Sequence, residues 1–179
     1  MTLPKVGRAI RCAGAAAVLA GDAASAVAQT LDAAPWRAEF QSCVSNAEPE
    51  ALSACEGRAS DRCMNEIEGG HSTLGMVECL GMEAALWDEV LNDEWGPLMA
   101  LMRAWDAEER EVFGHRFSNR ADALLEAQRA WIAFRDAECG LDYASWGSGS
   151  MRSIAHASCQ LSMTAERVAR LRGLRGDGT

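Results

Sequence analysis

Five residues spaced three or four apart carry the side chains best suited to chemistry in this chain. On an α-helix they share one narrow face, which holds an amide, an indole, a guanidinium and a thiol: Leu124, Gln128, Trp131, Arg135 and Cys139. Guanidinium and amide groups can bind an anion or a polar substrate. In a protein core the same groups need specific partners, because buried donors must be satisfied and a buried charge must be paired.

Arg135 is the residue on this face that most needs a partner, because the neighbouring Trp131 indicates that its stem is buried. We expect Asp88, on a long preceding helix, to form a bidentate ion pair with it. Asn92 and Gln128 would complete the hydrogen bonds. These residues could form an anion or substrate site or a structural network. We favour the network, since structural ion pairs also gather such side chains.

A short Gly/Ser segment after this helix is a candidate contact loop. Aromatic residues on loops are over-represented among binding hot spots, and this loop begins with a tryptophan. Two interpretations remain open: the indole contacts a protein partner, or it folds back over the end of the bundle while the glycines only make the turn. The residues are Trp146, Gly147, Ser148, Gly149 and Ser150.

Signatures of catalysis and metal binding are weak. His71, His115 and His156 lie in different segments, and no serine stands in a GxSxG motif. Paired carboxylates such as Glu108–Glu109 lie on polar faces without the apolar pocket that raises the pKa of a general acid. No CxxC occurs, and His156 has only Cys159 one helical turn away. We expect a protein that is not an enzyme and that has no cofactor and no metal site.

The first 28 residues have the pattern of a secretory signal peptide. A basic stretch up to Arg11 precedes the apolar run Ala13–Leu19, and small residues allow cleavage after Ala28. Cleavage would remove three basic residues and one acid, and so would change the net charge from −9 to about −11. That acidity argues against nucleic acid and anionic lipid surfaces and suits a basic protein partner. We expect a periplasmic or secreted protein.

Six cysteines remain after cleavage, and an even number in an exported chain indicates a disulfide framework. Fifteen pairings of six cysteines are possible. We expect the pairs that would each join two neighbouring helices across a turn: Cys43–Cys55, Cys63–Cys79 and Cys139–Cys159.

Helical periodicity and the scarcity of strand signals predict an all-α, disulfide-stapled bundle of about four to six helices. Pro35 and Pro49 suit first turns, and Ser72 or Thr73 suits the cap of the longest helix. Pro97 should interrupt or kink the helical region after residue 95. The expected helices are 35–47, 49–62, 74–95, 98–112, 120–143 and 151–171. Ser118 or Asn119 would cap the helix 120–143.

The sequence closely resembles the LprI-like lysozyme-inhibitor N-terminal domain family. The resemblance covers about residues 63–171 and is carried by AQRAWIAFRDAEC at Ala127–Cys139, together with Trp87-Asp88, Leu91-Asn92, Trp95, Leu98-Met99, Gly147–Ser150 and Cys159–Arg167. The family's namesake is an exported lipoprotein that inhibits lysozyme. This chain lacks a lipid-attachment motif, so the resemblance does not imply a membrane anchor.

The residue patterns and the resemblance together predict a four-part organisation. A signal peptide (1–28) precedes an N-terminal helical extension (29–62), the LprI-like helical domain (63–173) and a disordered tail (174–179). The function that the resemblance implies is inhibition of lysozyme-type muramidases by an exposed loop or acidic face. The alternative is a periplasmic structural or envelope-interaction module whose extension supplies the partner surface. No motif sets the oligomeric state.

Overall fold

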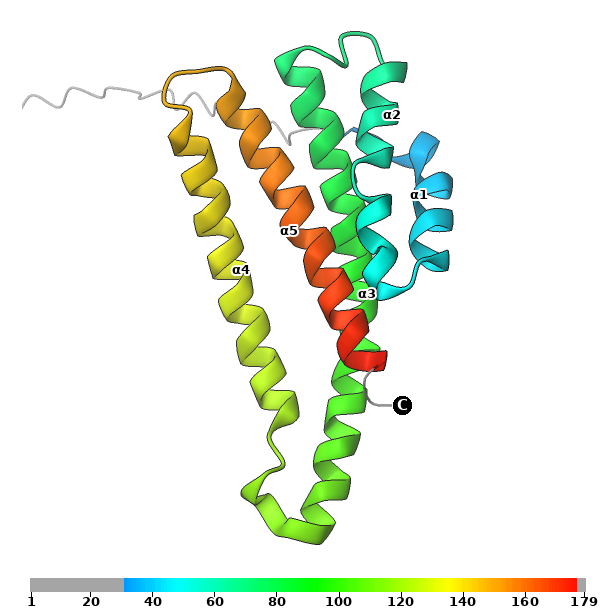
Figure 1. Ribbon diagram of the computed structural model, residues 1–179, viewed down its shortest axis with the longest axis vertical. Helices are drawn as coiled ribbons and strands as arrows, with labels where there is room; N and C mark the ends of the chain where they lie inside the picture. Colours follow the sequence, from blue (N-terminus) through cyan, green and yellow to red (C-terminus); the bar gives the residue numbers. More distant parts are fainter. Residues whose placement is uncertain (1–30, 177–179) are drawn as a thin grey trace, which may run out of the picture.

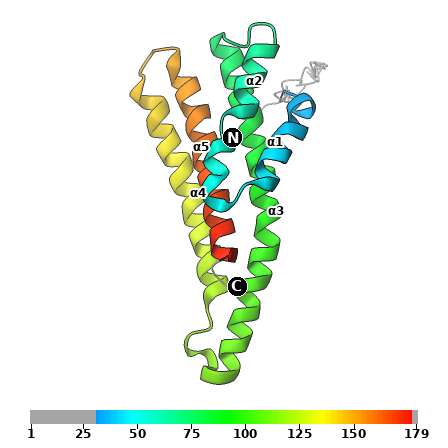
Figure 2. The same ribbon diagram turned by 45° about the vertical axis from the view of Figure 1, so that its right-hand side comes forward.

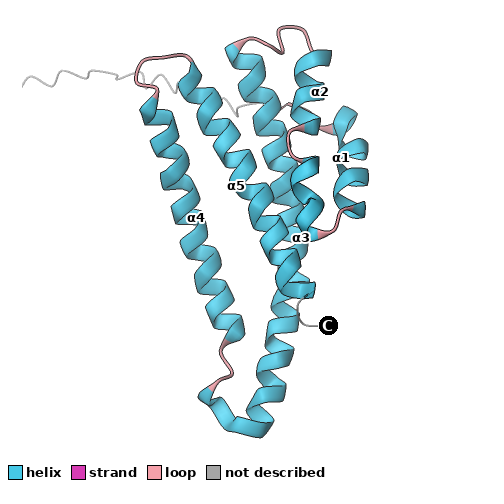
Figure 3. Cartoon of the chain, viewed as in Figure 1, coloured by secondary structure: helices cyan, strands magenta, loops and turns pink. Residues whose placement is uncertain are grey.

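A computed structural model of the chain describes residues 31–176, and the expected signal peptide lies outside this range. Helices account for almost all of the described residues, which contain no strand (Figures 1 and 3). The prediction of an all-α fold is confirmed. The elements are α1 (Ala34–Asn46), the 3₁₀ helix η1 (Pro49–Cys55), α2 (Arg58–Glu66), α3 (Thr73–Phe113), the 3₁₀ turn η2 (Gly114–Arg116), α4 (Arg120–Ser145) and α5 (Met151–Gly176).

The core forms along the seam between α3 and α5, the most extensive helix contact of the fold. Helix α4 lies on one side of this pair, and α1, η1 and α2 lie on the other (Figures 1 and 2). Burial of apolar surface stabilises a fold by about 25 cal/mol for each Å² removed from water. Aliphatic side chains from both long helices are fully buried at the seam. They include Leu86 and Leu98 of α3 and Leu161, Val168 and Leu171 of α5.

The expected helix over residues 49–62 is wrong, because the chain forms two elements there. Gly57, with a φ of 81°, follows the C-cap of η1 and stands at the N-cap of α2. The carboxylate of the fully buried Glu83 accepts hydrogen bonds from the backbone N–H groups of Gly57 (2.8 Å) and Ser60 (2.6 Å). The indole of Trp87 donates a third at 3.2 Å. A carboxylate at a helix N-terminus satisfies free amides and interacts favourably with the helix dipole, so Glu83 fixes where α2 begins.

Residues 34–66 pack into the same core as the longer helices. Trp36, Phe40 and Val44 of α1 are buried, and the ring of Phe40 meets Trp87 edge-on with centroids 5.1 Å apart. Trp36 also donates its indole N–H to Glu66 at 2.8 Å. The extension is therefore an integral part of the hydrophobic core.

Three disulfide bonds join neighbouring helical elements. They link Cys43 to Cys55, Cys63 to Cys79, and Cys139 to Cys159, which are the pairs that the sequence analysis expects. The first ties α1 to η1, the second ties α2 to α3, and the third ties α4 to α5. Each bond closes a chain segment across one turn of the bundle.

Helix α3 is one continuous element through Pro97, so of the two expected outcomes, an interruption or a kink, the interruption is wrong. Ser72 caps its N-terminus by accepting from the backbone N–H of Gly75 at 3.1 Å, as expected. Pro97 removes one donor, and its ring crowds the carbonyl of Asp93. Both residues are exposed, so water can satisfy that carbonyl. The buried residues on either side, Leu91 and Leu98, belong to one continuous core.

The cap of α4 also differs from the expectation. Asn119 occupies the N-cap but makes no side-chain cap hydrogen bond. Instead, the buried Asp106 of α3 accepts from the backbone N–H groups of Arg120 (2.9 Å) and Ala121 (3.0 Å). A carboxylate distant in sequence thus replaces the local cap and joins the two helices at the η2 turn.

Helix α5 is longer than expected and includes residues 174–176, part of the expected disordered tail. Arg172 donates to Glu94 of α3 at 2.7 Å and to the carbonyl of Val44 at 2.7 Å. Arg175 pairs with the second Glu94 oxygen at 2.7 Å. These tertiary contacts hold the last turns of α5 against α3.

We predict that Asp106→Asn destabilises the protein by about 1–2 kcal/mol at pH 7, because the amide keeps one acceptor but places its NH₂ group against the second backbone N–H and removes the charge. Burial raises the pKa of Asp106, but the backbone hydrogen bonds from Ala121 and Arg120 outweigh it, so the pKa lies below its ordinary value. The stabilisation by ionised Asp106 is therefore present above the unfolded-state pKa of about 3.9 and is lost as the pH falls through the lower folded-state value.

Urea denaturation from pH 7 to pH 2 measures this effect. The difference between wild type and variant should narrow below about pH 4. Asp93→Asn, an exposed carboxylate on the same helix, is the matched control and should change the free energy of unfolding little. A difference between wild type and Asp106→Asn that stays constant over the whole range would contradict this role.

Candidate functional site

The predicted ion pair between Asp88 and Arg135 is wrong. Arg135 donates from Nε and Nη2 to Asp136, at 3.1 and 2.9 Å, and lies 3.5 Å from the hydroxyl of Thr164. Asp88 is exposed and accepts from Asn92 of its own helix at 3.1 Å. The five residues of the predicted network do line one open hollow of about 270 Å³ between α3 and α4: Asp88, Asn92, Gln128, Trp131 and Arg135. The hollow separates the two charges that were expected to pair.

The polar face of α4 interacts with Arg167 of α5. Its Nε donates to the side-chain oxygen of the buried Gln128 at 2.8 Å. Its guanidinium carbon lies 5.5 Å from the centre of the Trp131 ring, and that of Arg135 lies 5.0 Å away. Burial, followed by the charge of Arg170, lowers the pKa of Arg167. The polar face is thus a network between α4 and α5, with two cations against one indole.

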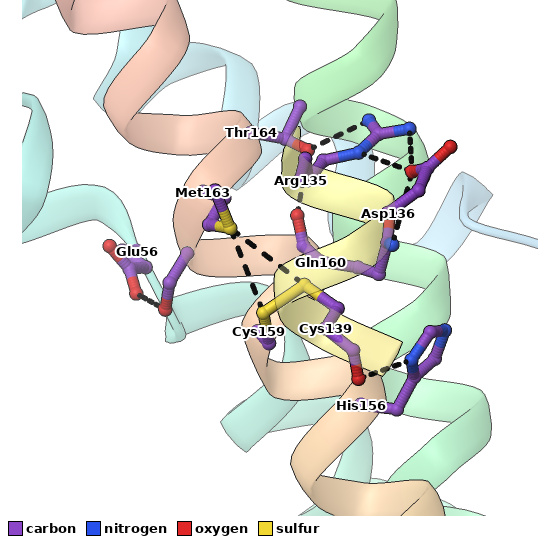
Figure 4. The surroundings of a disulfide bond; sticks show 10 residues. Glu56, Arg135, Asp136, Cys139, His156, Cys159, Gln160, Met163 and Thr164 are labelled. Atoms are coloured by element: carbon purple, nitrogen blue, oxygen red, sulfur yellow. Dashed lines mark hydrogen bonds and ion pairs between the residues drawn. A yellow bond between two sulfur atoms is a disulfide. The ribbon is translucent and has the colours of Figure 1, made fainter. Parts of the chain in front are cut away.

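A disulfide closes the upper part of the α4–α5 hairpin (Figure 4). The thioether sulfur of Met163 lies 3.8 Å from the sulfur of Cys139 and 3.7 Å from that of Cys159. His156 Nδ1 lies 2.9 Å from the carbonyl oxygen of Cys139. Because a carbonyl only accepts, Nδ1 carries the proton in this hydrogen bond. These contacts fix α4 and α5 relative to each other one to two turns from the loop.

Aromatic and cationic side chains continue this ordered region toward the loop. The guanidinium of Arg152 lies 4.0 Å from the centre of the Tyr143 ring, and Tyr143 meets His156 edge-on at 6.2 Å. Gly147 turns the chain with a φ of 53°, a conformation that favours glycine, and its N–H donates to Ala144 at 3.0 Å. The loop is a tight, hydrogen-bonded turn.

Trp146 is not buried by the bundle end, since 51% of its surface is exposed. It lines an open hollow of about 490 Å³ between the last turns of α4 and the first turns of α5. Glu138 and Asp142 line the same hollow from α4, with Ser158 and Ser162 from α5. Two carboxylates, two hydroxyls and one indole can bind a cationic side chain by ion pairing, hydrogen bonding and ring stacking.

The sequence analysis missed the acidic part of this hollow. Glu138, Asp142 and Trp146 follow one another at intervals of four residues, so they share one side of α4 and its cap. That spacing was present in the sequence. The other expected loop residues, Gly147, Ser148, Gly149 and Ser150, are exposed in the turn beside the hollow. Their contact with a partner remains a prediction.

A family model described as lysozyme inhibitor LprI matches residues 63–171. The chain belongs to this family. The match contains the polar network, the hollow beside Trp146 and the disulfide of the hairpin, whereas α1 and η1 precede it. At the level of the LprI family the described activity is inhibition of lysozyme.

A relative from Rhizobium meliloti (strain 1021), described as an uncharacterized protein, is 31% identical over 103 residues. The aligned part covers 58% of this chain and 73% of the relative. No solved structure matches the chain. Among residues 31–176, no three His, Cys, Asp or Glu side chains are grouped so that they could hold a metal ion.

We predict that replacing both Cys139 and Cys159 by serine lowers the free energy of unfolding by about 2–4 kcal/mol, because the unfolded chain regains the freedom that the cross-link removes. The turn at residues 147–150 should also become more susceptible to proteolysis, since the disulfide holds the helices beside it. Urea denaturation and limited proteolysis measure the two effects. Cleavage at the wild-type rate would show that the disulfide does not order the turn.

Proposed function

We propose that this protein is an exported, non-enzymatic inhibitor of lysozyme-type muramidases that contacts its target through the hollow beside Trp146. The observation that supports this proposal is the exposed Trp146 at the rim of a hollow that also contains Glu138 and Asp142. Membership of the LprI family supplies the class of target. The hollow supplies chemistry that suits a basic protein.

Charge favours this pairing at long and at short range. The net charge of −9 attracts a basic enzyme and accelerates encounter. At contact, an arginine or lysine of the target would lie between the carboxylates of Glu138 and Asp142. A guanidinium can also stack on the indole of Trp146, which adds a cation–π interaction.

The rigidity of the site favours affinity, because little conformational entropy is then lost on binding. The Cys139–Cys159 disulfide and the stacking of Arg152 on Tyr143 order the helices that carry the hollow. Trp146 caps α4 next to a hydrogen-bonded turn, so its backbone is held as well. We infer that the rigid end of this hairpin enters or covers the active cleft of the muramidase.

Export is part of the proposal. Three disulfide bonds suit an oxidising compartment such as the periplasm or the extracellular space. Between Leu31 and Gly176 the structure has no helix with the length and apolar character needed to cross a bilayer. We propose that cleavage after Ala28 releases the mature protein.

The alternative, an envelope-interaction module that binds through its N-terminal extension, has less support. The extension buries Trp36, Phe40 and Val44 in the common core, so these side chains serve the fold. Affinity capture from envelope extracts distinguishes the two functions, since the alternative requires an abundant partner other than a muramidase.

We predict that the purified protein slows lysis of bacterial cell walls by lysozyme and that Trp146→Ala weakens inhibition about 10-fold or more, as expected for a hot-spot tryptophan. The double variant Glu138→Gln/Asp142→Asn should also weaken inhibition and reduce its dependence on salt, because it removes the two charges that would pair with the enzyme. Turbidity assays at several inhibitor and salt concentrations measure both effects.

Control variants at the opposite end of the molecule (Figure 1) separate the site from general effects of charge and apolar surface. Glu108→Gln/Glu111→Gln removes the same charge from an exposed part of α3, and Phe113→Ala removes an exposed aromatic ring. Both should inhibit like the wild type. Undiminished lysis at a large excess of wild-type protein would reject inhibition of that enzyme, and full inhibition by Trp146→Ala would reject the proposed site.

A further inference from the structure

Helix α4 carries a second apolar face, separate from the face that packs against α5. In the structure all of its residues are exposed, including Phe134 (57%) and Leu141 (59%). Helix α4 also lies at the edge of the molecule in two views (Figures 1 and 2). We call this set the outer face of α4: Ala123, Ala127, Ala130, Phe134, Ala137 and Leu141.

The spacing of the outer face is that of a coiled coil. Successive residues are four, three, four, three and four apart, so the apolar pattern repeats every seven residues over the length of α4. A repeat of this period keeps one face of a helix in register with a second helix alongside. No described helix of the chain covers this face, since all of its residues are exposed.

We infer that a second copy of this protein covers the outer face, with the two α4 helices packed antiparallel. In the register that uses all six residues, Phe134 meets Ala130 of the second copy and Leu141 meets Ala123. Ala127 then meets Ala137. Phe134 and Leu141 each oppose an alanine in this register, so no two large side chains compete for the same space, and Ala127 and Ala137 form two thinner layers.

The other orientation fits less well. In a parallel pair in register, Phe134 would meet Phe134 and Leu141 would meet Leu141, so two layers would be wide. The alanines would then form four alanine–alanine layers, twice as many as in the antiparallel pair. The antiparallel pair also separates the flanking acids. Glu126 borders one edge of the outer face, and Glu138 borders the other edge. In an antiparallel pair, the edge that carries Glu126 meets the corresponding Glu126 edge of the second copy. Glu126 therefore lies near Gly140 of the second copy and away from its Glu138.

The size of the outer face predicts a weak dimer. Ala123 and Leu141 are 18 residues apart along α4, which corresponds to about 27 Å at 1.5 Å per residue. A strip of this length and about 10 Å wide is smaller than the roughly 800 Å² that each partner contributes to a standard stable interface. We expect a Kd of roughly 100 µM and a monomer at low micromolar concentration.

Sedimentation velocity of the purified, oxidised protein from about 1 µM to 1 mM tests the inference. The wild type should dimerise over this range, and Phe134→Glu should raise the Kd about 10-fold or more, because it places a charge in an apolar layer. Ile132→Glu is the matched control. Ile132 is an exposed apolar residue (42%) on the same helix, but it lies about 160° around the axis from Phe134.

Exchange of one layer tests the register. Ala130→Phe alone would place Phe against Phe and should weaken the dimer, whereas Ala130→Phe/Phe134→Ala restores a large side chain opposite a small one and should recover it. A monomeric wild type at 1 mM, equal loss in Ile132→Glu, or tighter association of Ala130→Phe would each overturn the antiparallel pair. Circular dichroism should confirm that every variant stays helical.

Discussion

The buried carboxylate of Glu83 is the constraint on which the arrangement of the N-terminal half depends. A charge without solvent exposure must be compensated, and here two backbone amides at the start of α2 and the indole of Trp87 compensate it. These hydrogen bonds set the position of α2 on α3. The Cys63–Cys79 disulfide joins the same two helices, and Phe40 packs against the indole that Glu83 orients. One carboxylate therefore links α1, α2 and α3.

The C-terminal half uses the same principle at two further places. Asp106 caps α4 from α3, and Glu94 holds Arg172 and Arg175 at the end of α5. In each case an acid of α3 receives donors from an element far away in the sequence. Helix α3 is thus the axis of the fold, and its buried acids decide where the other helices begin or end. The opposite end, where α4 and α5 meet, instead depends on a disulfide and on aromatic stacking.

Local features of the sequence predicted the elements that depend on local chemistry. Helical periodicity predicted the long helices, Ser72 predicted the cap of α3, and cysteine spacing predicted the three disulfide pairs. Predictions that required knowledge of a distant partner were less accurate. Asp106 replaced Asn119 as the cap of α4, and Arg167 replaced Asp88 as the partner of the polar face. Pro97 stayed within a helix because its cost falls on an exposed carbonyl.

The sequence by itself determined the all-α class, the family and the cross-links, because these follow from residue types and spacings within one or two turns of the chain. Only the tertiary structure decided which buried charges meet, that Trp146 is exposed beside Glu138 and Asp142, and that one face of α4 is left uncovered. The physical reason is that pairing and burial depend on the angles between helices. Asp88 and Arg135, for example, both line one hollow between α3 and α4 and do not form an ion pair.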